Sequence, residues 1–272
     1  MLKHLILCGA LDYMIRKPAP LLYLDTHAGA GSYRLDDERA GKTGEARQGV
    51  LALDFPALIA AVPEPARHLP VRYQQAIAPL LTKAAYPGSP ALARQLLRKS
   101  DRLALYELHP AEFRTLDANF GRDRRIRLYQ QDGFTSDRLL PGVQKRALVL
   151  IDPPYERKED YQRAANFVIR LHRRMRGAVI LLWYPVVERR RSDQLAQALV
   201  RAGLPDLWQC ELGMSADSQA WGMTASGLLL LNPPWELPKQ LRQILPALQS
   251  QLAPECGFHA LDCLVPETGS GK

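Results

Sequence analysis

The chain alternates short apolar runs with longer segments of helical periodicity over most of its 272 residues. The short runs have the length of strands, and the segments between them are long enough to form helices. This alternation predicts an α/β fold with a mostly parallel sheet, because a helix must connect consecutive parallel strands. The predicted strands are residues 21–25, 102–107, 126–130, the run 149–151, 178–183, 207–212 and 226–231.

Apolar spacing predicts helices over residues 2–17, 91–99, 111–120, 136–140, 161–175 and 192–201. Residues from about 36 to 88 interrupt the alternation with two helical patterns, 49–59 and 71–84. These patterns flank the turn Pro63-Glu64-Pro65. We therefore expect residues 1–272 to form a single domain that carries a small helical insertion at about 36–88.

The formal net charge of +8 favours an anionic partner, of which nucleic acid is the commonest, although a basic enzyme without such a partner would have the same charge. The four cysteines form no Cys-x-x-Cys pair, so neither a zinc site nor a disulfide framework is indicated. The sequence shows no apolar stretch near the roughly 18 residues that span a bilayer, and no signal peptide. We expect a cytoplasmic protein.

Acidic residues follow four of the predicted strands: Asp25, Glu107, Asp132 and Asp152. In open α/β sheets, ligands bind outside the carboxyl ends of the strands. Glu107 can accept two ribose hydroxyls, and Asp132 with Gly133 can meet an adenine amine and its ring. Asp25 and Asp132 could instead cap ordinary turns. The set as a whole suits S-adenosylmethionine, which has a ribose and an adenine but no phosphate.

The loop after the first strand contains Gly29 and Gly31, which would let a ligand approach the backbone. A nicotinamide dinucleotide site would require Gly-x-Gly-x-x-Gly and an acid about 20 residues later. The third glycine is missing here, and no strand-ending acid lies at that interval. No Gly-Lys-Ser/Thr nucleotide loop occurs either, so phosphate binding is disfavoured.

The motif Asp152-Pro153-Pro154-Tyr155 follows the apolar run Val149–Ile151. The prolines restrict the backbone, so the Asp152 carboxylate and the Pro153 carbonyl can face one nitrogen. Those two acceptors fit the hydrogens of an exocyclic amine, and Tyr155 can stack on the ring that carries it. Asp-Pro-Pro also forms ordinary turns, so the interpretation depends on the surrounding sequence.

Together these segments resemble the bacterial 23S ribosomal RNA adenine-N6 methyltransferase family, which is also connected with the catabolism of external DNA. The matching blocks, in order, are Tyr23-Leu24-Asp25-Thr26-His27-Ala28-Gly29-Ala30-Gly31, Tyr86-Pro87-Gly88-Ser89-Pro90, Glu107-Leu108-His109-Pro110, Asp132-Gly133-Phe134, Asp152-Pro153-Pro154-Tyr155, Trp183-Tyr184-Pro185-Val186-Val187, Gly222-Met223-Thr224-Ala225-Ser226-Gly227 and Asn232-Pro233-Pro234-Trp235.

The resemblance implies a class I S-adenosylmethionine-dependent methyltransferase, Rossmann-like, with a seven-stranded sheet and no metal. It also implies methylation of N6 of a specific adenine in 23S ribosomal RNA, protein-free or in an early assembly precursor, by a monomer. The expected catalytic residues are Asp152, Pro153 and Tyr155. From the residues themselves, Asp25, Gly29, Gly31, Glu107, Asp132 and Gly133 are expected at the cofactor. The resemblance also implies Glu107, Asp132 and Gly133, and it adds Lys3, His4, His27 and Ser89.

Members of that family carry Tyr-Arg-His and Phe-His-Ala-Gly-Asn runs just before the segment that resembles Leu2-Lys3-His4. Those runs help to form the adenine pocket, so three interpretations are open: a start codon assigned too late, a truncated chain, or a degraded pocket. We favour a start codon upstream of Met1, and the activity of the chain that begins at Met1 is in question. Asn232-Pro233-Pro234-Trp235 is a second amino-methyltransferase motif, but the last strand of this fold runs antiparallel, so we expect it to point away from the cofactor.

Three basic runs, 122–125, 172–176 and 189–191, are candidates for contacts with phosphates or are merely solvated surfaces. Two other functions fit parts of this pattern. One is a DNA adenine-N6 or protein glutamine methyltransferase, which would use the same amine or amide geometry. The other is a non-catalytic nucleic-acid-binding factor in the use of external DNA, which would need no methyl donor.

Overall fold

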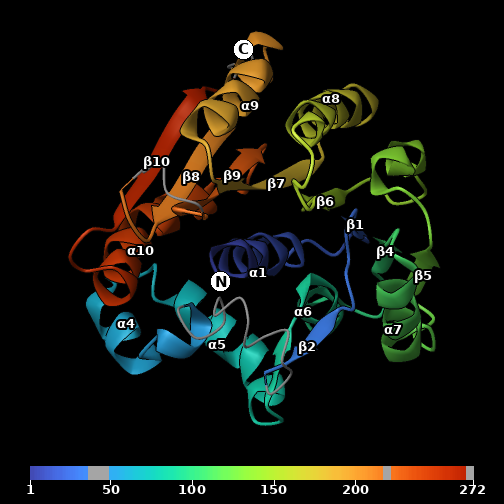
Figure 1. Cartoon of the computed structure of the whole chain (residues 1–272). Coiled ribbons are helices and arrows are strands. Elements are labelled where there is room, and N and C mark those ends of the chain that lie inside the picture. Colours follow the sequence, from blue (N-terminus) through green and yellow to red (C-terminus); the bar gives the residue numbers. More distant parts are fainter. Residues whose placement is uncertain (36–48, 217–221, 268–272) are drawn as a thin grey trace.

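A computed structural model describes residues 1–35, 49–216 and 222–267 of the chain. Its main sheet has eight strands, in the order β10-β8-β9-β7-β6-β1-β4-β5 (Figure 1). From one edge to the other they are β10 (Phe258–Val265), β8 (Leu207–Gly213), β9 (Ala225–Leu231), β7 (Val179–Val186), β6 (Ala147–Ile151), β1 (Leu22–Asp25), β4 (Arg102–Tyr106) and β5 (Ile126–Tyr129).

The five strands from β7 to β5 pair in parallel, and β9 is antiparallel to both of its neighbours. The α/β prediction is confirmed, but the expected seven strands become eight because β10 pairs antiparallel with β8. No residue of β10 is fully buried, and it contains the exposed polar residues His259 and Asp262. A prediction based on apolar runs misses such an edge strand.

The two faces of the sheet bury two separate apolar clusters. In β6, Leu148 and Leu150 face one cluster while Val149 and Ile151 face the other, as the alternation of side chains along a strand requires. Both faces of a central parallel strand are therefore apolar. One face is covered by α1 (Leu2–Met14), α6 (Ser89–Leu96), α7 (Pro110–Phe120) and α10 (Glu236–Leu252), and the other by η2 (Gly133–Leu139), α8 (Glu159–Arg174) and α9 (Arg189–Arg201).

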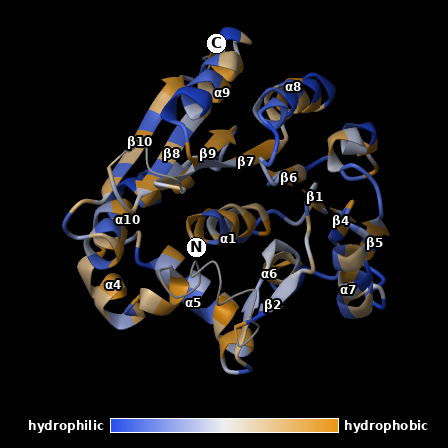
Figure 2. Ribbon diagram, in the orientation of Figure 1, coloured by the Kyte–Doolittle hydropathy of each residue, from blue (hydrophilic) through white to orange (hydrophobic). Residues whose placement is uncertain are grey.

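Helix α1 is buried on almost every side, between the sheet, α10, α6 and α5 (His68–Leu81). Figure 2 shows hydrophobic residues along much of α1, whereas α8 and α9 are largely hydrophilic on their outer sides. A helix that is apolar all round belongs in a core. Its 13 residues span about 20 Å: Lys3 near its start contacts Asp152 just after β6, and the carbonyl of Met14 at its end accepts from Arg146 just before β6, so the helix runs along the strands.

The predicted helix over residues 2–17 ends earlier, at Met14, four residues before Pro18. The segment predicted as a helix at 136–140 is instead the 3-10 helix η2. The prediction included neither α10 nor β10. The patterns at 49–59 and 71–84 correspond to η1 (Val50–Ala52) with α4 (Phe55–Ala61), and to α5.

A separate two-stranded sheet, β2 (Ser32–Arg34) with β3 (Ala85–Pro87), brings the two ends of this region together. The definition of an insertion at about 36–88 stays a prediction, and residues 36–48 lie outside the described residues. None of the helices in the described part of the chain is long and apolar enough to cross a membrane.

Candidate active site

Asp152, Asp25, Glu107 and Asp132 follow or end the adjacent parallel strands β6, β1, β4 and β5. All four acids therefore lie on the side of the sheet where the parallel strands end, which we call the carboxyl edge. The side where these strands begin is the amino edge. Strands β4 and β5 follow β1 on one side of it, and the next strand along the chain, β6, pairs with β1 on its other side. Such a reversal leaves a crevice at the carboxyl edge, where open α/β sheets bind ligands. Asp25 and Asp152 flank this crevice.

Asp25 is fully buried and accepts two hydroxyl hydrogen bonds at Oδ2, from Tyr23 at 2.7 Å and from Ser89 at 2.6 Å. The backbone N–H of His27 donates to Oδ1 at 3.3 Å. Burial raises the pKa of this carboxyl to about 6, against the opposing effect of both hydroxyls. Two residues expected at the cofactor, Asp25 and Ser89, thus bind each other and fix the start of α6 to the end of β1.

The His27 ring lies between β1 and η2. Its Nδ1 is 2.7 Å from Thr26 Oγ1, and its ring meets Phe134 edge-on at a centroid separation of 5.1 Å. Burial lowers the pKa of His27 to about 4, although nearby carboxylates, Asp152 first, oppose this shift. The ring is therefore neutral at pH 7 and can serve as a donor or acceptor without adding charge to the crevice.

The opposite pKa shifts of Asp25 and His27 predict opposing effects of pH on stability. The raised pKa of Asp25 gives a stabilising contribution that is present below its ordinary value of 3.8 and is lost as pH rises through about 6. The lowered pKa of His27 gives a contribution that is present above 6.5 and is lost as pH falls through about 4. In wild type the two slopes partly cancel.

Asp25→Asn should remove the first contribution alone. Between pH 4 and 6, the free energy of unfolding should then rise more steeply with pH than in wild type, by up to about 1.4 kcal/mol per pH unit. Urea denaturation across this range measures the slope. The same change at exposed Asp262 is the control and should leave the slope as in wild type. Equal slopes for Asp25→Asn and wild type would contradict the assignment.

Glu107 is tied to two backbone N–H groups. Oε2 accepts from Gly29 at 2.8 Å and Oε1 accepts from His109 at 2.7 Å. Each carboxylate oxygen can accept a further hydrogen bond. The side chain is half-buried beside the glycine loop, so it can take two vicinal hydroxyls while the loop holds it in place. Gly29 has φ of +57°, which glycine adopts at no steric cost.

Asp132 faces an arginine that the sequence analysis did not single out. Oδ1 of Asp132 accepts from the backbone N–H of Phe134 at 2.9 Å, and Oδ2 accepts from Arg163 at 2.7 Å. The Arg163 guanidinium also lies 4.6 Å from the Phe134 ring centroid. A Cβ at neighbouring Gly133 would lie 1.9 Å from the Thr26 carbonyl oxygen, so the loops after β5 and β1 touch backbone to backbone.

The Lys3 ammonium forms an ion pair with Asp152 Oδ2. Both side chains are about one-fifth exposed, and no hydrogen bond to the other carboxylate oxygen is found within the described residues. The family resemblance implies a cofactor contact for Lys3, whereas in the structure Lys3 contacts the carboxylate of the Asp-Pro-Pro-Tyr motif. Nothing in the sequence could have shown this contact, because the two residues are 149 positions apart.

Tyr155 has φ of +53°, and its hydroxyl donates to the carbonyl oxygen of Trp183 at 2.7 Å. Its ring packs at centroid distances of 4.5 Å from Tyr161 and 6.1 Å from Trp183. Pro153 is buried, and no hydrogen bond to its carbonyl is found among the described residues. The motif thus holds an aromatic ring and two acceptor groups in one turn.

His4 is buried beside Lys3 on α1. Its Nδ1 is 2.8 Å from the Tyr86 hydroxyl, which is 2.7 Å from that of Tyr73. Burial, together with the charge of Lys3, holds the pKa of His4 well below its usual range. The ring is neutral and firmly oriented, and it lies on the same side of the sheet as β3, which carries Tyr86.

The second motif lies elsewhere. Asn232 follows β9, whose last residue Leu231 pairs with Ile180 near the start of β7. Because β9 is antiparallel, Asn232 lies at the amino edge, as expected, and its side-chain amide lies 3.5 Å from the Ala178 carbonyl. Strand direction thus separates two similar motifs that a pattern search would not distinguish.

Strand direction also determines at which edge of the sheet each of the three basic runs lies. Residues 122–125 precede β5 and residues 172–176 precede β7, which places both runs at the amino edge. Only the run 189–191 follows β7 at the carboxyl edge, and within it Arg189 and Arg191 are ion-paired with Glu211 and Glu188. Exposed Arg190 lies there together with Arg157 and Lys158, which follow the Asp-Pro-Pro-Tyr motif.

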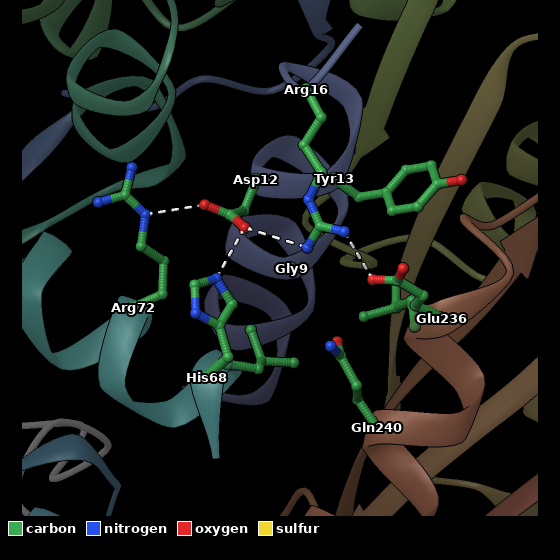
Figure 3. A pocket seen from close by; sticks show the side chains of 10 residues that line it. Gly9, Asp12, Tyr13, Arg16, His68, Arg72, Glu236 and Gln240 are labelled. Atoms are coloured by element: carbon green, nitrogen blue, oxygen red, sulfur yellow. Dashed lines mark hydrogen bonds and ion pairs between the residues drawn. The ribbon is translucent and has the colours of Figure 1, made fainter. Parts of the chain in front are cut away.

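A small pocket lies at the far end of α1, where Asp12 binds His68, Arg72 and Arg16 (Figure 3). It encloses about 10 Å³, room for one water molecule, and ion pairs fill its walls. We assign it a structural role. Among the described residues, no group of three or more His, Cys, Asp or Glu side chains is arranged to hold a metal ion.

Comparison with known proteins gives matches over nearly the whole chain. A family model described as ribosomal RNA large subunit methyltransferase D, RlmJ, matches residues 18–265. The chain is 40% identical over 276 residues to ribosomal RNA large subunit methyltransferase J of Escherichia coli, covering 98% of this chain and 94% of that protein. The protein of the same name from Haemophilus influenzae is 36% identical over 277 residues, with the same coverage.

The structure is also similar to the crystal structure of a protein from Legionella pneumophila. The TM-score is 0.84 at 31% sequence identity, and the match covers 96% of this chain and 95% of that one. The likeness therefore includes both the sheet and the helices that cover it.

Proposed function

Because the chain belongs to the RlmJ family of ribosomal RNA large subunit methyltransferases, we propose that it transfers a methyl group from S-adenosylmethionine to the exocyclic N6 of an adenine in 23S ribosomal RNA. The observation that carries the choice of an amine is the Asp152 carboxylate next to the Pro153 carbonyl, which accepts no hydrogen bond from the described residues, at the switch point of the sheet. We further propose a monomer that acts on RNA which is protein-free or at an early stage of assembly.

The carboxyl edge fits S-adenosylmethionine, which supplies a methyl group on a sulfonium centre. Glu107 would accept hydrogen bonds from the ribose hydroxyls, and Asp132 with Gly133 would hold the adenine. Gly29 and Gly31 have positive φ, and a Cβ there would lie 2.2 Å from the Tyr33 hydroxyl and 2.3 Å from the Phe120 ring, so this loop needs both glycines to keep its shape. Acids line this edge where a phosphate site would need donors, so the charge suits a cationic donor rather than a nucleotide phosphate.

The remaining expected contacts would come from α1 (Lys3 and His4), from the end of β1 and the loop after it (Asp25 and His27), and from the start of α6 (Ser89). Asp25 and Ser89 act there through each other, and His27 and His4 are both neutral. A neutral imidazole ring can donate a hydrogen bond to a carboxylate without the electrostatic repulsion that a protonated ring would exert on the positively charged sulfonium.

The chemical difficulty is that the lone pair of an adenine amine is delocalised into its ring. Asp152 and the Pro153 carbonyl would accept both amine hydrogens, which directs the lone pair toward the methyl group. The nitrogen then forms the new N–C bond as the C–S bond breaks, sulfur keeps the bonding pair, and N6 releases a proton to water. Preorganised acceptors of this kind contribute roughly 2–4 kcal/mol to lowering a barrier.

One side chain must adjust when the base enters, and a second receives the base. The Lys3 ammonium has to yield its hydrogen bond to Asp152, at least in part, because the amine needs the same carboxylate. Tyr155 offers a ring against which the base can stack after it leaves its helix, and this departure costs a few kcal/mol. In-line placement of nitrogen, methyl and sulfur would supply a further gain through proximity.

The direct test is a methylation assay on protein-free 23S ribosomal RNA with labelled S-adenosylmethionine, followed by mapping of the modified nucleotide. The proposal requires N6-methyladenine at one position. Parallel reactions with double-stranded DNA and with protein separate the alternatives. Transfer to DNA or to glutamine but not to RNA would overturn it, and binding of RNA without binding of the donor would favour a non-catalytic factor.

Arg157, Lys158 and Arg190 at the carboxyl edge are expected to contact RNA phosphates. Single changes of these residues to Gln should each weaken RNA binding and lower the slope of log K against log salt by about 0.7–0.9. Filter binding from roughly 50 to 200 mM KCl measures this slope. The matched controls are Arg124→Gln and Arg173→Gln, both exposed and at the amino edge. Equal slopes in both groups would place the RNA elsewhere.

A further inference from the structure

Trp183 lies beside the proposed catalytic carboxylate. It follows Leu182, which pairs with Ile151 at the end of β6, so Trp183 is level with Asp152 on the neighbouring strand. Its side chain is half-buried. From the sequence alone, Trp183 has no role of its own beyond its place in one of the matching blocks.

The Trp183 indole has a fixed orientation. Its Nε1–H donates to Ser226 Oγ on β9 at 2.7 Å, and its backbone carbonyl receives the hydroxyl of Tyr155 at 2.7 Å. The rest of the ring packs against the cluster that contains α1. The only polar atom of the side chain is thus turned toward β9, which leaves a ring face for contact with a cation or another ring.

The Lys3 ammonium lies over the face of the Trp183 indole. Its Nζ is 5.7 Å from the Trp183 ring centroid, and the same ammonium is ion-paired with Asp152. A nitrogen that donates to Asp152 therefore lies near the indole face. The Tyr155 ring stands 6.1 Å away at an interplanar angle of 60°, so the two rings form a corner.

We propose that Trp183 is the second wall of the target-base pocket and orients the adenine ring so that its amine reaches Asp152. This inference rests on the proposed function and names a residue that determines the specificity of that site. A purine stacked on Tyr155 presents its edge to Trp183, and tilted rings of this kind attract at centroid distances of about 4.5–7 Å.

Two physical consequences follow from this placement. The smaller ring of cytosine, which also carries an exocyclic amine, leaves the corner unfilled, so Trp183 favours purines. In addition, N6 gains positive charge as the N–C bond forms, and the face of an indole attracts a nearby cation. Trp183 therefore affects both the binding of the base and its turnover, but not the binding of the methyl donor.

Four variants test the role of Trp183: Trp183→Leu, Trp183→Phe, Ser226→Ala and the control Trp208→Leu. Trp208 is also half-buried and its indole donates to a side chain, Asp206, but it pairs with Leu230 near the amino edge. The readouts are KM for 23S ribosomal RNA, kcat, and the dissociation constant of S-adenosylmethionine by calorimetry. Binding of adenosine 5′-monophosphate and cytidine 5′-monophosphate, by NMR, needs no turnover.

Trp183→Leu is expected to raise KM for RNA about tenfold, lower kcat, and abolish the preference for the adenine nucleotide, with donor affinity unchanged. Trp183→Phe should keep most activity, Ser226→Ala should cost about threefold in KM, and Trp208→Leu should match wild type. Wild-type KM, kcat and nucleotide preference in both Trp183 variants would overturn the inference while rRNA methylation by wild type stands. If wild type methylates no rRNA, the proposed function fails. The nucleotide preference of Trp183→Leu, compared with that of wild type, still shows whether Trp183 forms a wall of the base pocket.

Discussion

Asp152→Ala is expected to lower the rate of methyl transfer to 23S ribosomal RNA about a hundredfold or more, while the affinity for S-adenosylmethionine stays close to that of wild type. The change removes one of the two acceptors that would hold the amine, and it also leaves the Lys3 ammonium without its partner. Single-turnover transfer at saturating RNA measures the rate, and calorimetry measures the affinity.

Two further variants sharpen this test. Asp152→Asn keeps one acceptor oxygen and should fall between alanine and wild type. Asp123→Ala is the matched control, because Asp123 is also an ion-paired carboxylate but is bound to Arg125 at the amino edge. It should transfer methyl groups at the wild-type rate. Transfer close to that rate by Asp152→Ala would refute the catalytic assignment.

Gly133→Ala is expected to lower the free energy of unfolding by about 2–4 kcal/mol and the affinity for S-adenosylmethionine at least about tenfold. The added Cβ would lie 1.9 Å from the Thr26 carbonyl oxygen and 2.6 Å from its carbon, and neither backbone atom can rotate away. The loops after β1 and β5 would have to separate, which would displace Asp132 from the crevice.

Urea denaturation and calorimetry measure both effects. Gly177→Ala is the matched control, since nothing lies within 4 Å of the Cβ it would gain. It should change the stability by less than about 0.5 kcal/mol and leave the affinity unchanged. If Gly133→Ala were as stable as wild type and bound the donor equally well, the close approach of the two loops would not support the cofactor site.

The sequence predicted the central sheet and the positions of its acids because both follow from local patterns. Asp25, Glu107, Asp132 and Asp152 each come at or just after an apolar run, and parallel strands bring such residues to one edge. The same reasoning placed the Asn232 motif at the opposite edge. These predictions needed only the order and direction of the strands.

The contacts of the site could not be predicted in this way. The ion pairs of Lys3 with Asp152 and of Arg163 with Asp132 join segments far apart in the chain, and both cations lie in helical segments where charge usually indicates a solvated surface. The hydrogen bond from Ser89 to Asp25 also could not be predicted from the sequence. Strand β10 was missed because its residues are half-buried or exposed.

The conformation of Tyr155 bears on how a thermostable variant of this protein would arise. A bulky residue in the left-handed region, here at φ +53°, typically sacrifices about 1–3 kcal/mol of folding free energy. Glycine adopts that geometry without strain. Glycine at position 155 would nevertheless lose the ring contacts with Tyr161 and Trp183 and the hydrogen bond to the Trp183 carbonyl, a loss of about 3–5 kcal/mol for a large aromatic side chain. Laboratory selection for heat resistance should therefore keep the aromatic ring despite its backbone strain.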